Sequence, residues 1–170
     1  MEKTPRAVRF GFPVEWDSGT PFPFLFTNEH KTFLTFRLPE PDPDWDGTYS
    51  TPRSPGDEGT ASLALVEFKR CFSARLGSPN DEVMHGHYLR GHGQRLYSAQ
   101  IVENSPWLEE LRSMNAVHRG FDPDRWNSLH HYIFWFHDST FDCIAESYDV
   151  TLHQTSMTAL AAEVTAKLFV

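Results

Sequence analysis

Histidines and carboxylates gather in two short stretches of the sequence that are otherwise apolar. The first covers residues 79–87 (PNDEVMHGH) and the second covers residues 130–138 (HHYIFWFHD). Side chains of these types are costly to bury unless they find partners, and sites that supply such partners are often functional. We therefore expect the two stretches to meet in the folded chain and to form one pocket.

The first stretch contains a candidate metal site. His85 and His87 are two residues apart, and on an extended strand such residues project from the same face. Two imidazoles placed in this way can share a divalent metal ion such as zinc or iron, which would activate a bound water. We therefore expect a strand at 84–89, with His92 as a third ligand and with Glu82, His137 and Asp138 as alternatives to it. The competing interpretation is that these histidines only donate hydrogen bonds at a strand end.

The second stretch contains a candidate general base. His137 precedes Asp138 and Ser139, but neighbouring residues on a strand point to opposite faces, which argues against a local catalytic triad. A carboxylate from elsewhere in the chain can instead orient the imidazole, and Asp81, Glu82 and Asp142 are the choices. The candidate acid–base residues are Asp81, Glu82, His137 and Asp138. The alternative is a turn in which Asp138 closes a hairpin and backbone groups satisfy His137.

The elements that must position these residues are mainly strands. Alternating apolar patterns predict a hairpin at 24–27 and 31–38, a long strand at 60–76, a shorter strand at 96–102, and a second hairpin at 130–137 and 141–150. Both faces of the 130–137 strand are apolar, so we expect it to be central and covered on one side by the final helix.

Two helices are predicted. Asn104 or Ser105 can cap a helix that has Pro106 in its first turn and runs to about residue 118. A C-terminal helix follows from the helical spacing of Met157, Leu160, Ala161, Val164 and Leu168. The predicted fold class is α+β, with a curved antiparallel sheet or half-barrel, a C-terminal helix and one shorter inserted helix.

Length and composition limit the kind of protein. The 170 residues fit one domain, residues 1–170, with a long loop rich in Pro, Gly and Asp at about 39–59. Aromatic residues make up 14% of the chain, which is typical of a folded protein. The formal net charge of -8 would repel a phosphate backbone, so nucleic acid is not an expected partner.

The sequence also suggests a compartment. It shows neither the apolar core of a signal peptide nor a run long enough to cross a bilayer, so we expect a soluble cytoplasmic protein with no membrane partner. Cys71 and Cys143 are far apart in the sequence and form neither a redox motif nor a zinc motif. We expect both to be buried, inert thiols.

Three stretches resemble those of small bacterial proteins of uncharacterised function. They are residues 77–82 (GSPNDE) together with Gly86 and His87, residues 102–107 (VENSPW), and residues 136–141 (FHDSTF). The resemblance covers roughly the C-terminal half of the chain and implies no activity, cofactor or catalytic residue. It does encourage treating the three stretches as one site.

Two functions from different classes fit these patterns. In the first, the protein is a binding module for a small molecule or a protein partner, and the polar residues serve as hydrogen-bonding scaffold. In the second, it is a small metal-dependent or histidine–carboxylate enzyme. The first interpretation is favoured, because no catalytic or cofactor motif is complete.

Overall fold

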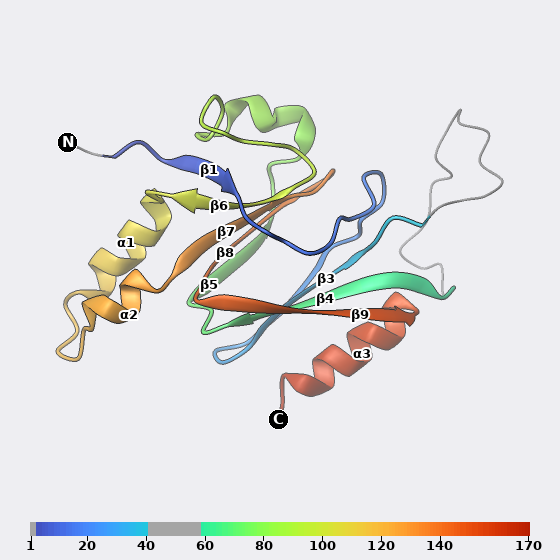
Figure 1. The fold of residues 1–170 in the computed structure, drawn as a ribbon. Helices are drawn as coiled ribbons and strands as arrows, with labels where there is room; N and C mark the ends of the chain where they lie inside the picture. Colours follow the sequence, from blue (N-terminus) through green and yellow to red (C-terminus); the bar gives the residue numbers. More distant parts are fainter. Residues whose placement is uncertain (1–2, 41–58) are drawn as a thin grey trace.

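The computed structural model describes residues 3–40 and 59–170 of the chain. Within these residues the strands pair antiparallel in two sheets, one with the order β1–β6–β7–β8–β5 and the other with the order β2–β3–β4–β9 (Figure 1). The helices lie outside this pair of sheets. The α+β class, the antiparallel pairing and the C-terminal helix are therefore confirmed, while the strands are divided between two sheets and close no barrel in the described part of the chain.

The strands are β1 (Arg6–Arg9), β2 (Phe24–Thr27), β3 (Thr32–Arg37), β4 (Ala61–Lys69), β5 (Ser73–Gly77), β6 (Ala99–Glu103), β7 (His130–Trp135), β8 (Thr140–Ala145) and β9 (Ser147–Thr155). The helices are the 3-10 helix η1 (Asp81–Gly86), α1 (Pro106–Asn115), α2 (Pro123–Asn127) and α3 (Met157–Lys167). None of these helices is both long enough and apolar enough to span a bilayer. Most of the predicted loop at 39–59 lies outside the described residues.

An aromatic core fills the space between the two sheets. Phe134 and Phe136 enter it from the five-stranded side, and Phe36 and Phe68 enter it from β3 and β4. The ring centroids of Phe36 and Phe136 are 5.5 Å apart, and those of Phe68 and Phe134 are 6.0 Å apart. Trp16 closes one side with its ring 4.8 Å from Phe136. Each such buried ring stabilises the fold by about 2 kcal/mol through the apolar area it removes from water.

Two long strands bend from one sheet into the other. The sequence predicts single strands at 60–76 and 141–150, but the first is divided into β4 and β5 and the second into β8 and β9. The divisions lie side by side, because β4 pairs with β9 and β5 pairs with β8. Arg70, with a φ of 47°, interrupts the first strand, and its Nε lies 2.6 Å from Oε2 of Glu146 at the second interruption. Strands that change sheet in this way form the corner of a sandwich, which the alternating pattern alone does not reveal.

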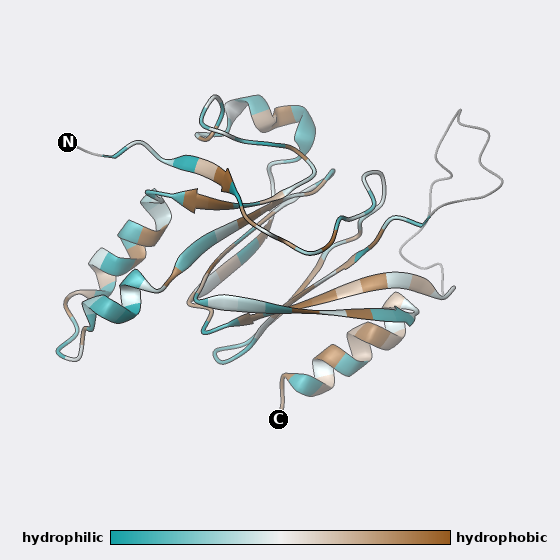
Figure 2. Cartoon of the chain, in the orientation of Figure 1, coloured by the Kyte–Doolittle hydropathy of each residue, from teal (hydrophilic) through white to brown (hydrophobic). Residues whose placement is uncertain are grey.

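The outer faces of the sheets are covered by different helices. On the four-stranded sheet, Leu63 and Leu65 pack against Leu160 and Val164 of α3. The expectation that the final helix covers the 130–137 strand is therefore wrong. The outer face of β7 is instead covered by α1, α2 and residues 81–89. Figure 2 shows that α1 carries more hydrophilic residues than α3.

The other predicted elements were mostly confirmed. The first hairpin forms as β2 and β3, closed by Asn28, whose Oδ1 accepts hydrogen bonds from the backbone N–H groups of His30 and Lys31. Ser105 is the residue that caps α1. The short elements β1 and α2 were missed, because four or five residues carry too little periodicity to predict an element.

Candidate functional site

Parts of the two histidine-containing stretches do meet, at Asp81 and His137. The Asp81 backbone N–H donates to the His137 carbonyl at 3.0 Å, and His137 Nδ1 lies 2.8 Å from Asp81 Oδ2. The Thr140 hydroxyl donates to the Pro79 carbonyl at 2.8 Å and holds the two segments together. Of the three carboxylates that the sequence offered as partners for His137, the structure brings Asp81 to the imidazole.

Tyr97 completes this cluster and was not predicted. Its hydroxyl donates to Asp81 Oδ2 at 2.5 Å and lies 3.3 Å from His137 Nδ1. The hydrogen bond from Tyr97 lowers the pKa of Asp81, and the bond to His137 lowers it further. The same bond raises the pKa of Tyr97 to about 12. The cluster is open to solvent, because 40% of the His137 side chain is exposed.

Two of the predicted acid–base residues lie outside this cluster. Asp138 Oδ1 is 3.9 Å from His137 Nε2, and 85% of the Asp138 side chain is exposed. Glu82 is exposed, and within residues 3–40 and 59–170 its carboxylate forms no hydrogen bond or ion pair. Neither side chain is therefore held in a fixed position relative to the imidazole.

The predicted metal ligands are not brought together. The strand expected at 84–89 is wrong, because Asp81–Gly86 forms the 3-10 helix η1 and the alternation of side chains is lost. His85 and His92 are exposed, while His87 packs edge-on against Trp135 at 4.8 Å, and burial lowers its pKa. In the part of the chain that the structure describes, no group of three or more His, Cys, Asp or Glu could hold a metal ion. Two acidic residues just after Pro79 and Asn80 are a helix-start signal that could have predicted η1.

A second polar cluster lies beneath α1. His131 is completely buried, and both of its ring nitrogens have partners. Nδ1 lies 2.7 Å from the Ser105 Oγ, and Nε2 lies 2.8 Å from Asp142 Oδ1. Arg75 Nε donates to the other carboxylate oxygen of Asp142 at 3.1 Å. The Trp107 ring covers the group, 4.3 Å from the Arg75 guanidinium carbon and 5.2 Å from the His131 ring.

Sheet register places the strand residues of this cluster. In the pairing of β7 with β8, Asp142 is opposite Ile133, so it is a diagonal neighbour of His131 on the outer face. The pairing of β5 with β8 places Arg75 directly opposite Asp142. Ser105 approaches from above as the N-cap of α1, where its Oγ accepts a hydrogen bond from the Leu108 N–H at 3.1 Å.

The hydrogen bonds of this cluster run in one direction. A carboxylate only accepts hydrogen bonds, so the proton between His131 and Asp142 is on His131 Nε2. In the neutral imidazole Nδ1 is then an acceptor, and the Ser105 hydroxyl donates to it. The cluster therefore has the order of donors that orients a serine hydroxyl toward a base.

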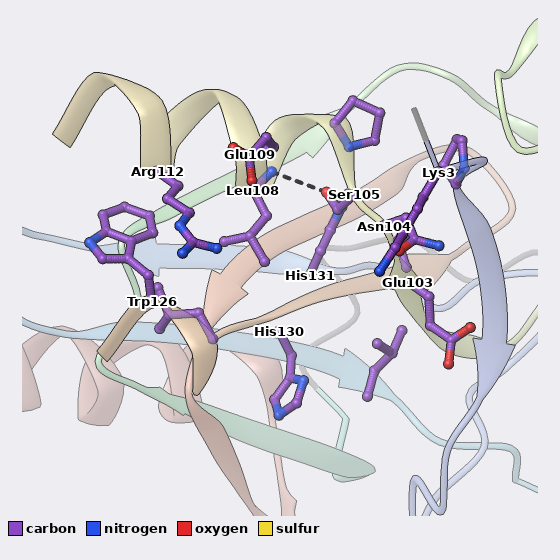
Figure 3. A pocket seen from close by; sticks show the side chains of 15 residues that line it. Lys3, Glu103, Asn104, Ser105, Leu108, Glu109, Arg112, Trp126, His130 and His131 are labelled. Atoms are coloured by element: carbon purple, nitrogen blue, oxygen red, sulfur yellow. Dashed lines mark hydrogen bonds between the residues drawn. The ribbon is translucent and has the colours of Figure 1, made fainter. Parts of the chain in front are cut away.

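A pocket of about 570 Å³ opens next to this cluster (Figure 3). In Figure 3, Arg112 and Trp126 lie toward one end of the pocket and Lys3 and Glu103 toward the other, with Ser105 between. Apolar and charged residues both contribute to the wall. The lining residues that matter for its chemistry are Lys3, Glu103, Ser105, Glu109, Arg112 and His131.

The sequence contained a signal for this second cluster. On its predicted strand, His131 shares a face with Ile133 and Trp135. Asp142 shares a face with Thr140 and Ile144, so both ionisable residues lie on mainly apolar faces. The two-residue turn lies at 137–138, where the Phe136 N–H donates to the Ser139 carbonyl, and it sets the register that makes His131 and Asp142 diagonal neighbours. Ser105 could be predicted only as a helix cap, because its contact with His131 depends on where α1 packs.

Comparisons with protein-family models, with curated proteins and with solved structures found no match to this chain. The resemblance of three stretches to small bacterial proteins therefore stays a prediction. In the structure, residues 77–82 and 136–141 meet at the Asp81–His137 cluster, whereas residues 102–107 contribute Ser105 to the other cluster. The two histidines are six residues apart on a nearly extended chain, roughly 20 Å, so the three stretches form two sites.

Proposed function

We propose that this protein is a binding module for a small molecule, and that the ligand occupies the pocket between α1, β6 and β7. One observation carries this proposal: Ser105 is among the residues that line a pocket of about 570 Å³, and its side chain is held by the buried His131, which Asp142 holds in turn. Pockets that hold small ligands are typically about 300 to 1,000 Å³ in volume.

The lining suggests the chemical class of the ligand. Leu108, Trp126 and Leu129 provide an apolar wall, which suits a ligand with a small hydrophobic body. Ser105 and Arg112 provide polar contacts at defined positions. Because Ser105 is held by hydrogen bonds before any ligand arrives, little side-chain entropy is lost on binding.

A pair of matched substitutions on α1 tests the pocket. Glu109 lines the pocket and Glu110 does not, and both are exposed on the same helix. Glu109→Trp should fill the pocket, whereas Glu110→Trp removes the same charge and adds the same ring elsewhere. Small aromatic acids, amides and alcohols would be screened by ligand-observed NMR.

We expect members of this panel to bind the parent protein and Glu110→Trp, and to lose affinity for Glu109→Trp. Binding should also change the fluorescence of Trp126, which lines the pocket. The proposal is contradicted if no probe binds, or if every bound probe binds Glu109→Trp as tightly as the parent.

A further inference from the structure

The Ser105 oxygen retains one unused lone pair. It accepts a hydrogen bond from the Leu108 N–H and donates its own hydrogen to His131. A hydroxyl oxygen has two lone pairs, and no second donor reaches this oxygen from residues 3–40 or 59–170. Since Ser105 lines the pocket, a molecule bound there can meet this lone pair.

The groups behind Ser105 are arranged to take its proton. A serine hydroxyl is a weak nucleophile until a base accepts its hydrogen, and the base is most effective when a third group fixes its orientation. His131 Nδ1 is 2.7 Å from the hydroxyl, and Asp142 holds the other ring nitrogen at 2.8 Å. Arg75 and the covering Trp107 ring restrict the carboxylate and the imidazole in turn.

The backbone presents Ser105 on a sharp turn between a strand and a helix. β6 ends at Glu103, Asn104 adopts a φ of 52°, and α1 begins at Pro106. Asn is one of the residues that tolerate a φ of this sign, so the chain can turn here without a glycine. The N-terminal end of α1 carries partial positive charge, which would stabilise negative charge that develops beside Ser105.

From this geometry we infer that Ser105 is an acyl-accepting nucleophile that hydrolyses small carboxylic esters, with His131 as general base and Asp142 as a positioning residue. The inference rests on the proposed function, because the ester must first bind in the pocket. Ser105 Oγ attacks the ester carbonyl carbon while its proton moves to His131 Nδ1. The bond from that carbon to the alkoxy oxygen then breaks, and the departing alcohol takes the proton from His131.

Water completes the reaction. A water molecule attacks the acyl carbon and gives one proton to His131 Nδ1. The bond between the acyl carbon and Ser105 Oγ breaks, Oγ takes that proton back, and the carboxylic acid leaves. Each cycle therefore consumes one ester and one water and returns the protein unchanged. In the structure Nδ1 rather than Nε2 faces the serine, and the relay needs only one ring nitrogen on each partner.

Covalent labelling tests the nucleophile directly. An alkyl fluorophosphonate forms a bond between its phosphorus and the serine oxygen and loses fluoride, so intact mass and peptide mapping locate the modified residue. We expect labelling at Ser105 in the parent and none at this position in Ser105→Ala. Ser156→Ala is the matched control, because Ser156 caps α3 through the Ala159 N–H at 3.1 Å, and within residues 3–40 and 59–170 its hydroxyl has no hydrogen bond to a histidine. It should label like the parent.

Hydrolysis of p-nitrophenyl acetate and butyrate tests the roles of the other residues. We expect His131→Gln to lower kcat by about a hundredfold, because it removes the general base. Asp142→Asn should lower kcat and leave KM unchanged, since Asp142 does not touch the ester. Circular dichroism establishes that each variant is folded. If His131→Gln does not fold, labelling of Ser105 in the parent still tests whether Ser105 is the nucleophile.

The possible results separate this inference from the proposed function. If esters or their ketone analogues bind Ser105→Ala but the parent is never labelled at Ser105, the pocket stands and the nucleophile is overturned. If neither labelling nor binding is found in folded parent protein, both are overturned. Hydrolysis that survives in Ser105→Ala would also overturn the role of Ser105.

Discussion

His131 and His137 lie six residues apart and each bonds a carboxylate at 2.8 Å, yet their surroundings are opposite. His131 is completely buried and uses both ring nitrogens. His137 is 40% exposed, and its Asp81 and Tyr97 partners sit at the surface. Hydrogen bonds of the same length therefore differ in what their loss costs. In the interior the lost bond leaves unpaired polar groups, whereas at the surface water can replace it.

The same comparison explains why the two clusters suit different chemistry. A buried network resists rearrangement, so it can hold a hydroxyl in one position for a reaction. An exposed cluster exchanges with water, and its charges are screened. We therefore propose the Ser105 cluster as the site, although the sequence pointed first to His85 and His87 and then to His137.

The largest expected effect comes from removing the buried histidine. His131→Ala removes one buried hydrogen-bond partner from the Asp142 carboxylate and one from the Ser105 hydroxyl, and should lower the free energy of unfolding by about 3 kcal/mol. Urea denaturation measures this value. His130→Ala, the exposed neighbour, should change it little; equal losses in the two variants would contradict the contrast between the histidines.

A smaller effect is expected when the carboxylate is made neutral. Asp142→Asn keeps the shape but weakens the bonds to His131 and Arg75, and should cost about 2 kcal/mol. The same denaturation experiment applies. Stability equal to the parent would show that this buried bond is as replaceable as the surface one.

The next effect separates the hydrogen bond of Ser105 to His131 from its role as a helix cap. Ser105→Ala and Ser156→Ala each remove a serine N-cap and should each cost about 1 kcal/mol for that reason. Ser105→Ala should cost roughly 1 kcal/mol more, because His131 also loses its partner. Thermal melts of both variants give the difference. No difference would mean that the bond to His131 adds nothing to the cap.

The smallest expected effect is at the exposed cluster. His137→Gln should leave the Tm close to that of the parent, because water replaces the lost bond. A loss like that of His131→Ala would remove the distinction between the two histidines.

At the exposed cluster, the pKa of Asp81 should instead reveal which groups bond its carboxylate. Tyr97→Phe removes the largest cause of the lowered Asp81 pKa, so the pKa should rise toward the ordinary value of 3.8. Carboxyl carbon NMR follows this group. The folded-state pKa lies below the unfolded one, so the stabilising contribution of Asp81 is present above about pH 3.8 and is lost as the pH falls through the folded value. An unchanged pKa in Tyr97→Phe would show that the tyrosine does not bond the carboxylate in solution.

Periodicity predicted the elements better than their partners. The β2–β3 hairpin, α1 and α3 follow from local patterns, and so does the burial of both faces of β7. The pattern could not show that strands bend near Arg70 and Glu146, because alternation continues through a bend. It also could not show which helix covers β7, since any apolar helix face satisfies the same requirement.

The candidate sites were predictable to different degrees. For His137 the sequence offered Asp81, Glu82 and Asp142 as partners, and only the folded chain selects Asp81. His85 and His87 failed as metal ligands because the argument assumed a strand, and a two-residue spacing loses its meaning in a 3-10 helix. The Ser105 cluster needed the packing of α1, which is a tertiary contact.

The paired bends of β4–β5 and β8–β9 have a consequence for how the chain folds. Ala61 pairs with Thr155 across most of the sequence, and the neighbouring segment of each strand belongs to the opposite layer. The β2–β3 and β7–β8 hairpins can form from local contacts, but the two layers are joined only when β4 meets β9 and β5 meets β8. Distant pairings of this kind slow folding, so we expect the aromatic core to close later than either hairpin forms.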